Sequence, residues 1–258
     1  MCATTQTLLQ EFLRIRAQPF NQGTAPAIIL SLMRLRILDR NAVVGFFPSD
    51  HHFENDEAFV ADVNSAFVYA ESRRRSIVLL GVAPDGPEVQ YGWIEPGAHI
   101  DSRSSQRVFC VNRFWEKPSL AQASSLMDQG CLWNSFVMVG HLDAFIRLIS
   151  DACPHLIRCF DAVGDTYLTS NEEASVLYVY SSIASTNFSE AVLSPHARVL
   201  SVLSGRNLGW SDLGEPARVL ALLGRRANAV DTNGIRPNQQ DSRLRMMPGH
   251  SRTLTDEA

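Results

Sequence analysis

The sequence lacks three patterns that would assign its chemistry at once. It has no CxxC cysteine pair, no Walker-type phosphate loop and no GxSxG element. These absences argue against the common zinc sites, against P-loop nucleotide binding and against a serine hydrolase elbow. The five cysteines are odd in number and scattered, which is typical of a protein from a reducing compartment rather than of a disulfide framework.

Long apolar runs and a strong excess of one charge are also missing. No run approaches the roughly 20 apolar residues of a membrane span, and the N-terminus does not resemble a signal peptide. We therefore expect a cytoplasmic protein with no membrane partner. The net charge of -4 argues against a nucleic-acid partner. Three consecutive arginines, Arg73 to Arg75, follow a helix-like segment, and we interpret them as its cationic end rather than as a phosphate patch.

The first half of the chain alternates between helix-like and strand-like segments. With 45% apolar and 19% charged residues among 258, most of the chain is expected to be globular. Helical spacing predicts helices over 25–38 and 57–74, and continuous apolar runs predict buried strands over 43–47 and 76–84. This alternation predicts βαβ units and a parallel sheet with helices on its faces.

The second half is less regular. It contains no internal repeat, and the segments 171–183 and 197–205 supply further helix or strand material. We predict one domain over residues 1–226 and a disordered tail over residues 227–258. The clearest elements alternate as strand, helix, strand and helix, over 108–114, 119–130, 132–140 and 141–152.

Two aspartates follow strand-like segments, Asp50 in VVGFFPSDHHF and Asp212 in GWSDLGEP. Ligands of open α/β sheets sit beyond strand ends, and Mg²⁺ prefers one or two carboxylates together with substrate phosphates. Both residues also have plain structural explanations. Asp50 could form an Asx turn or cap a helix that starts near Glu54, and Asp212 could mark a chain reversal. From these patterns alone both interpretations stay open.

Polar residues with neighbouring aromatics form further clusters, namely YGWIEPG (91–97), FWEKP (114–118) and LWNS (132–135). Lys117 beside Glu116 could supply a cation for a phosphate group, although such a pair is more often a solvated edge. In the loop NQGTAPA, Gly23 allows a ligand to approach the backbone, while Thr24 could simply cap the next helix. The adjacent His51 and His52 are interpreted as structural, because neighbours in an extended segment point to opposite sides.

Taken in order, seven motifs resemble the sugar-phosphate nucleotidyltransferases, most closely the mannose-1-phosphate guanylyltransferases. They are NQGTAPA, FFPSDHHF, YGWIEPG, FWEKP, LWNS, TNFSEAVL and WSDLGEP, and they run from about Gln18 to Leu223. The resemblance implies an α/β fold with a Rossmann-like, glycosyltransferase-A-like mixed sheet and helices on both faces. It also implies transfer of GMP from GTP to mannose 1-phosphate, with Mg²⁺ as cofactor and GDP-mannose and pyrophosphate as products.

The same resemblance implies a role for each matching residue. Asp50 and Asp212 would hold Mg²⁺ against the phosphates. Lys117 would contact the sugar phosphate. The residues implied around the hexose are Gly92, Glu116, Asn134 and Ser135, and those implied to face the nucleotide base are Gly23 and Thr24.

The sequence departs from the family pattern in two places. No glycine-rich loop with an arginine precedes NQGTAPA, so we expect a chain that is truncated at its N-terminus. Phe136 follows Ser135 where the family commonly has glycine. Two hypotheses therefore remain. The first is a guanylyltransferase. The second is a chain without catalytic activity, either a nucleotide-sugar or sugar-phosphate binding protein or an inactive fragment. A homo-oligomer is left open.

Overall fold

The computed structural model describes residues 18–100, 107–216, 218–220 and 222–224, and the chain divides after Ser211 into two compact units. The expected tail over 227–258 lies outside the described residues. The elements follow in the order α2 (Thr24–Leu38), β1 (Val43–Phe46), β2 (His51–Phe53), α3 (Asp56–Ser72), β3 (Ile77–Val82), β4 (Gly92–His99), β5 (Val108–Glu116), α4 (Leu120–Asp128), β6 (Leu132–His141), α5 (Leu142–Ala152), α6 (Pro154–Asp161), η1 (Gly164–Thr166), α7 (Glu172–Ser182), η2 (Ser189–Leu193), η3 (Ala197–Val199), β7 (Leu200–Gly205) and β8 (Trp210–Asp212).

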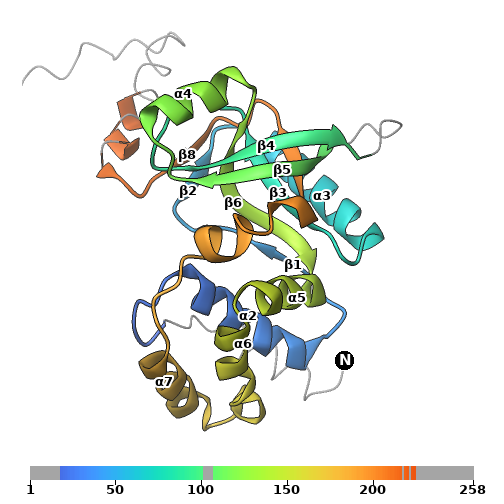
Figure 1. Ribbon diagram of the computed structural model, residues 1–258, viewed down its shortest axis with the longest axis vertical. Coiled ribbons are helices and arrows are strands. Elements are labelled where there is room, and N and C mark those ends of the chain that lie inside the picture. Colours follow the sequence, from blue (N-terminus) through green and yellow to red (C-terminus); the bar gives the residue numbers. More distant parts are fainter. Residues whose placement is uncertain (1–17, 101–106, 217, 221, 225–258) are drawn as a thin grey trace, which may run out of the picture. The chain divides into compact units, whose positions relative to one another are not determined.

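A six-stranded mixed sheet organises the first unit (Figure 1). Its strand order is β1-β6-β3-β7-β5-β4, and β4 also pairs with the first residues of β6. The pair β3–β7 is parallel, whereas β6 runs antiparallel to β1 and β3, and β5 runs antiparallel to β4 and β7. The mixed sheet implied by the resemblance is confirmed. The parallel sheet predicted from alternation is wrong, because buried apolar runs mark strands without giving their direction.

Helices cover both faces of this sheet, as predicted. Along β3, Ile77 and Leu79 point into one apolar cluster, and Val78 and Leu80 point into another. The alternation follows from the two-residue period of a strand. The first cluster also contains side chains of α2, α5, α6 and α7, and the second contains side chains of α3 and α4.

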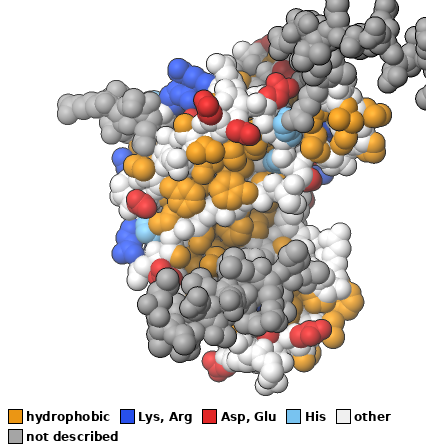
Figure 2. Space-filling model, turned by 180° about the vertical axis from the view of Figure 1, so that it is seen from behind, with side chains coloured by type: hydrophobic (Ala, Val, Ile, Leu, Met, Phe, Trp, Pro, Cys, Tyr) orange, Lys and Arg blue, Asp and Glu red, His pale blue; other side chains and the backbone are white. Residues whose placement is uncertain are grey.

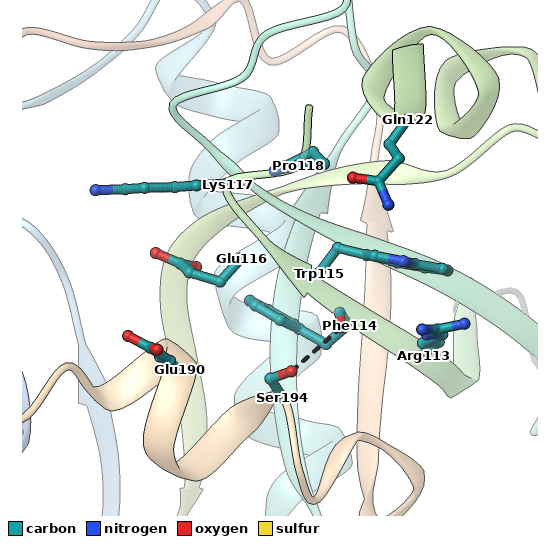
Figure 3. A pocket seen from close by; sticks show the side chains of 9 residues that line it. All are labelled: Arg113, Phe114, Trp115, Glu116, Lys117, Pro118, Gln122, Glu190 and Ser194. Carbon is teal, nitrogen blue, oxygen red and sulfur yellow. Dashed lines mark hydrogen bonds between the residues drawn. The ribbon is translucent and has the colours of Figure 1, made fainter. Parts of the chain in front are cut away.

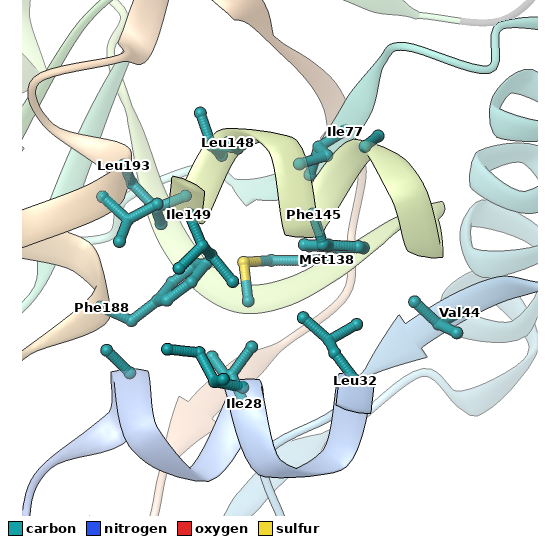
Figure 4. Packing of buried hydrophobic residues seen from close by; sticks show 14 of the residues in the cluster. Ile28, Leu32, Val44, Ile77, Met138, Phe145, Leu148, Ile149, Phe188 and Leu193 are labelled. Atoms are coloured by element: carbon teal, nitrogen blue, oxygen red, sulfur yellow. The ribbon is translucent and has the colours of Figure 1, made fainter. Parts of the chain in front are cut away.

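The first cluster is the larger one and includes the interface between α2 and α5 (Figure 4). Leu32 of α2 and Phe145 of α5 are completely buried, and so is Met138 of β6 between these helices. Each such side chain contributes roughly 1.5–3 kcal/mol by leaving water. α5 presents Leu142, Phe145 and Ile149 on one face because these residues recur at helical spacing.

A second, small sheet joins β2 to β8. The Trp210 indole donates a hydrogen bond to Nδ1 of His51 over 3.1 Å, so His51 has the structural role expected for it. The next helix, α3, is capped by Asn55, whose side chain accepts from the Ala58 amide over 3.0 Å. The helix-cap alternative for Asp50 is therefore wrong.

Large apolar side chains also remain at the surface. Phe47, Val60 and Tyr178 are among those exposed, and Figure 2 shows apolar side chains gathered on the face seen there. Exposed apolar residues are usual in soluble domains, so their presence alone assigns no function. Among the described residues, no helix has the length and apolar character needed to cross a membrane.

Candidate functional site

A cavity of about 680 Å³ opens beside the end of β5 (Figure 3). This volume lies within the range of small-molecule sites. Its wall comes from three parts of the first unit, namely the last residues of β5 with the loop that follows, the first turn of α4, and η2 with the next residue. The lining residues are Arg113, Phe114, Trp115, Glu116, Lys117, Pro118, Gln122, Glu190 and Ser194.

The chain turns sharply where β5 meets the cavity. Lys117 has a positive φ of 47°, which side chains other than glycine adopt rarely and at a cost of about 1–2 kcal/mol. The next helix is fixed by a capping box in which the amide of Ser119 donates to Gln122 over 3.1 Å. Strain of this kind persists only where the surroundings impose it and is common at binding sites.

Three charged side chains meet at one side of the cavity. Figure 3 shows the carboxylates of Glu116 and Glu190 on the same side as the extended Lys117 side chain. Burial raises the pKa of Glu116, Lys117 opposes this rise, Glu190 adds to it, and a hydrogen bond with the Asn187 side chain opposes it. The arrangement offers a cation for an anionic ligand and carboxylates that can accept hydrogen bonds from hydroxyl groups.

Gly92 lies directly opposite Glu116 in the β4–β5 pairing. A Cβ atom at Gly92 would lie 2.8 Å from the Phe114 ring and 3.1 Å from Oε2 of Glu116. No side chain fits there without displacing these groups. The structure thus brings together three of the predicted residues, Gly92, Glu116 and Lys117.

Asn134 and Ser135 are buried in β6 and do not belong to the described cavity wall. The Ser135 hydroxyl donates to the Leu80 carbonyl over 2.7 Å, and the Asn134 side chain accepts from the Phe136 amide over 3.1 Å. These bonds stabilise an irregular stretch of β6, where Phe136 has a φ of 57°. A left-handed backbone favours glycine. This is a physical reason for the glycine of the family pattern at the position where this chain has Phe136.

Gly23 and Thr24 stand at the start of α2, against residues 186–188. The φ of Gly23 is 82°, and a Cβ atom there would lie 2.5 Å from the Thr186 carbonyl oxygen. Thr24 is the first residue of the helix, and its hydroxyl accepts a hydrogen bond from the Phe188 amide over 2.9 Å. The predicted capping role of Thr24 is therefore wrong, since its hydroxyl joins α2 to the segment that leads into η2.

The two predicted metal ligands lie near strand ends, Asp50 in the turn after β1 and Asp212 as the last residue of β8. Asp50 lies between β1 and β2 with its side chain 59% exposed and 3.9 Å from Nε2 of His51. Asp212 belongs to the second unit, where it accepts from the Gly214 amide and forms a 2.9 Å ion pair with Arg218. The hydrogen bond from the Gly214 amide is compatible with the turn interpretation of Asp212, and a shared ion for the two aspartates stays a prediction. Within the described ranges, no three or more histidine, cysteine, aspartate or glutamate residues gather as a metal site.

Sequence reasoning assigned no role to Glu190, Asn187, Ser194 or Gln122. The first three flank or belong to η2, a turn of π-helix, and π-helical turns are frequent at functional sites. The Ser194 hydroxyl donates to the Phe114 carbonyl over 3.4 Å and so ties this segment to β5. Asn187 and Glu190 lie in the motif TNFSEAVL, which gave no role to either residue, and Gln122 has the Ser-x-x-Gln spacing of a capping box.

Comparisons with known proteins find relatives of this chain and solved structures that resemble it. Residues 6–223 match the protein family described as nucleotidyl transferase. The mannose-1-phosphate guanylyltransferase of Salmonella montevideo is 28% identical over 84% of this chain and 45% of its own length. The alginate biosynthesis protein AlgA of Pseudomonas syringae pv. tomato is 27% identical over 97% of this chain and 50% of its own length. The chain thus spans about half the length of the curated relatives it matches.

A solved structure supports the fold independently. A protein from Thermus thermophilus, described as a mannose-1-phosphate geranyltransferase, superposes with a TM-score of 0.70 at 23% identity. The match covers 81% of this chain and 58% of that one. It confirms the mixed α/β architecture.

Proposed function

Because this chain belongs to the nucleotidyl transferase family, we propose that it transfers GMP from GTP to mannose 1-phosphate, giving GDP-mannose and pyrophosphate. Several curated relatives carry the name mannose-1-phosphate guanylyltransferase, which supports this choice of substrates. We place the reaction in the cytoplasm, where GTP is available. The single observation that carries the proposal is the Glu116–Lys117 cavity.

Lys117 is the proposed contact of the sugar phosphate. Attack by a phosphate oxygen on the α-phosphorus of GTP brings anions together, so catalysis depends mainly on positioning and charge neutralisation. No protein nucleophile is needed, and the sugar phosphate is already ionised near neutral pH. A lysine in the wall of the cavity can supply this charge.

The hexose is proposed to lie beside Glu116. The carboxylate can accept hydrogen bonds from sugar hydroxyl groups, and the missing side chain at Gly92 leaves room next to it. Asn134 and Ser135 would support this subsite from β6. Gly23 and Thr24 are proposed to face the nucleotide base.

Magnesium is proposed as the cofactor, held by Asp50 and Asp212. The donor set fits, because both are carboxylates and Mg²⁺ takes oxygen ligands from one or two carboxylates plus substrate phosphates. The oxygens of Asp212 already accept from Gly214 and Arg218, and each has a second lone pair. When bound, the ion would neutralise phosphate charge. The chain's own residues bind and orient the two substrates.

The test measures Mg²⁺-dependent pyrophosphate release by the full chain, with each common nucleoside triphosphate and with mannose 1-phosphate or glucose 1-phosphate. We expect turnover with GTP and mannose 1-phosphate. Loss of one charge-stabilising contact should lower kcat/KM by about 10²–10³ in Lys117→Met, and Asp212→Ala should abolish turnover. Arg113→Met is the matched control, because it removes an equal charge from the same cavity, where Arg113 lies over Trp115 at 4.8 Å.

Calorimetric titration with mannose 1-phosphate separates the remaining outcomes. Binding without turnover would identify a non-catalytic sugar-phosphate binding protein. A folded chain that neither binds nor turns over any of these compounds would disprove the proposal.

A further inference from the structure

A second hollow, of about 460 Å³, lies at the opposite end of β5. Cys110 borders it near the start of β5, whereas Glu116 ends that strand at the candidate site. Six strand residues span roughly 20 Å, so the two sites are separate. The residues around the hollow are Tyr69, Arg73, Arg74, Arg75, Ser76, Ile100, Cys110 and Val199.

One side of this hollow consists of three consecutive arginines. Arg73 lies over the Tyr69 ring at 5.2 Å, and Arg74 donates to the Asn41 side chain over 2.9 Å. In the part of the chain that the structure describes, no carboxylate forms an ion pair with Arg73, Arg74 or Arg75. Three like charges that no carboxylate of the described residues pairs with create a positive potential that attracts an anion.

Only the first of the three arginines lies at the end of α3. The helix ends at Ser72, its last turn contains no basic residue, and Arg73 is already the cap. The effect of the helix dipole fades beyond the last turn, so it does not account for Arg74 and Arg75. The sequence-based interpretation therefore fits Arg73, at the end of the helix, and leaves Arg74 and Arg75 for another role.

The other side of the hollow is mostly apolar, and buried hydrogen bonds hold its wall in place. Val199 is 61% exposed, Cys110 is exposed, and Ile100 completes this surface. Below it, the Ser201 hydroxyl is hydrogen bonded to Tyr69 at 3.1 Å and to Ser76 at 3.0 Å. These bonds join α3, β7 and the residue before β3, and they hold the wall of the hollow in place.

We propose that this hollow binds a phosphorylated small molecule, with phosphate at Arg73 to Arg75 and an apolar or aromatic group on Ile100 and Val199. Arginine matches phosphate geometry with several donors and also stacks on planar rings. The volume suits a ligand of nucleotide size. The inference does not depend on the proposed transfer reaction, because it uses none of the residues of that site.

Cys110 provides a local reporter. The full chain is treated with N-ethylmaleimide, an uncharged thiol reagent, and modification of each cysteine is followed by peptide mass spectrometry. GDP and pyrophosphate are the probes, at constant ionic strength. A ligand at about ten times its Kd should slow modification of Cys110 about tenfold, with saturation. Cys159 of α6, which is partly buried, serves as the internal reference.

The control variants decide the result. Arg74→Gln combined with Arg75→Gln should remove the protection, whereas Arg158→Gln, at an exposed position on α6, should leave it intact. Protection by both probes would mean that phosphate suffices, and protection by GDP alone would show that the aromatic part contributes. Absence of protection, equal slowing of Cys159, or protection that persists in the folded double variant would overturn the proposal.

Discussion

Among the places in the first unit where a carboxylate lies beside a cation, two differ strongly in burial and in what surrounds them. Arg34 and Glu172 form a 3.2 Å ion pair between α2 and α7, with side chains only 5% and 11% exposed. Glu172 also accepts from the Leu168 amide over 3.1 Å. We call this ion pair closed, because both side chains are buried and both of these contacts of Glu172 are with other parts of the fold.

The Glu116–Lys117 site is open by comparison. The two residues are adjacent in sequence and face a cavity, a second carboxylate stands close by, and the backbone of Lys117 is strained. The fold depends on a closed pair because removal of one partner leaves the other charge buried and unpaired, whereas an open pair keeps its charges available for a ligand. The difference predicts that substitutions at the first pair change stability and that substitutions at the second change activity.

The largest effect is expected at the closed pair. Arg34→Met leaves Glu172 buried without its cation, so the free energy of unfolding should fall by about 3–5 kcal/mol in urea melts followed by circular dichroism. Arg34→Met combined with Glu172→Leu should recover most of this loss. The pyrophosphate release per folded molecule should not change.

Arg36→Met is the matched control on the same helix. Arg36 pairs with Asp161 at 2.7 Å, but these side chains are 30% and 45% exposed. An exposed pair of this kind contributes less than about 1 kcal/mol. Equal losses for Arg34→Met and Arg36→Met would contradict the contrast between closed and exposed pairs.

The next largest effect concerns the open pair, where replacing Lys117 should lower activity without lowering stability. Lys117→Gly should lower kcat/KM for pyrophosphate release by about 10²–10³, because the cation is lost. The same substitution relieves a positive φ, so the free energy of unfolding should stay equal or rise by up to about 1 kcal/mol.

Lys117→Ala separates these two contributions. It removes the cation but keeps a side chain at the strained position, so it should lose as much activity as Lys117→Gly and be the less stable of the two. If Lys117→Gly were clearly less stable than Lys117→Ala, the left-handed backbone at Lys117 would not be a source of strain.

Much of the fold could be predicted from the sequence, because buried apolar residues recur with the period of a helix or form short continuous runs in a strand. The predicted strands over 43–47, 76–84 and 132–140 correspond to β1, β3 and β6, and the helix over 141–152 corresponds to α5. Strand direction was not readable. It depends on which strands lie side by side, and a continuous apolar run is compatible with either direction.

The candidate site could be predicted only in part, because sequence patterns show which residues are neighbours along the chain. Glu116 and Lys117 stand together in the chain, so the sequence could pair them, and Gly92 joined them through a motif. Glu190 reaches the same cavity from η2. Its motif TNFSEAVL was recognised, but a local motif does not show which distant residues its side chains will contact. Asn134 and Ser135 had the right residue types, but the structure gives their polar groups partners within β6 and β3.

The smallest expected effect comes from the charge of Glu116. Burial raises its pKa above the ordinary 4.5, and Lys117 only partly opposes this. A carboxyl group with a raised folded pKa favours folding while it is protonated, and this contribution is lost as pH rises through the folded pKa. Glu116→Gln cannot ionise, so its stability relative to the unmodified chain should increase as pH rises above 4.5.

Urea melts between acid and neutral pH measure this difference, with Glu71→Gln as the control for charge removal at an exposed helix position. A difference that shrinks as pH rises would mean that Lys117 outweighs burial and that the two side chains form a second closed pair. Mannose 1-phosphate should then bind no more weakly to Lys117→Met than to the unmodified chain. The pH dependence of Glu116→Gln and the affinity of Lys117→Met for mannose 1-phosphate therefore test the open character of this site independently.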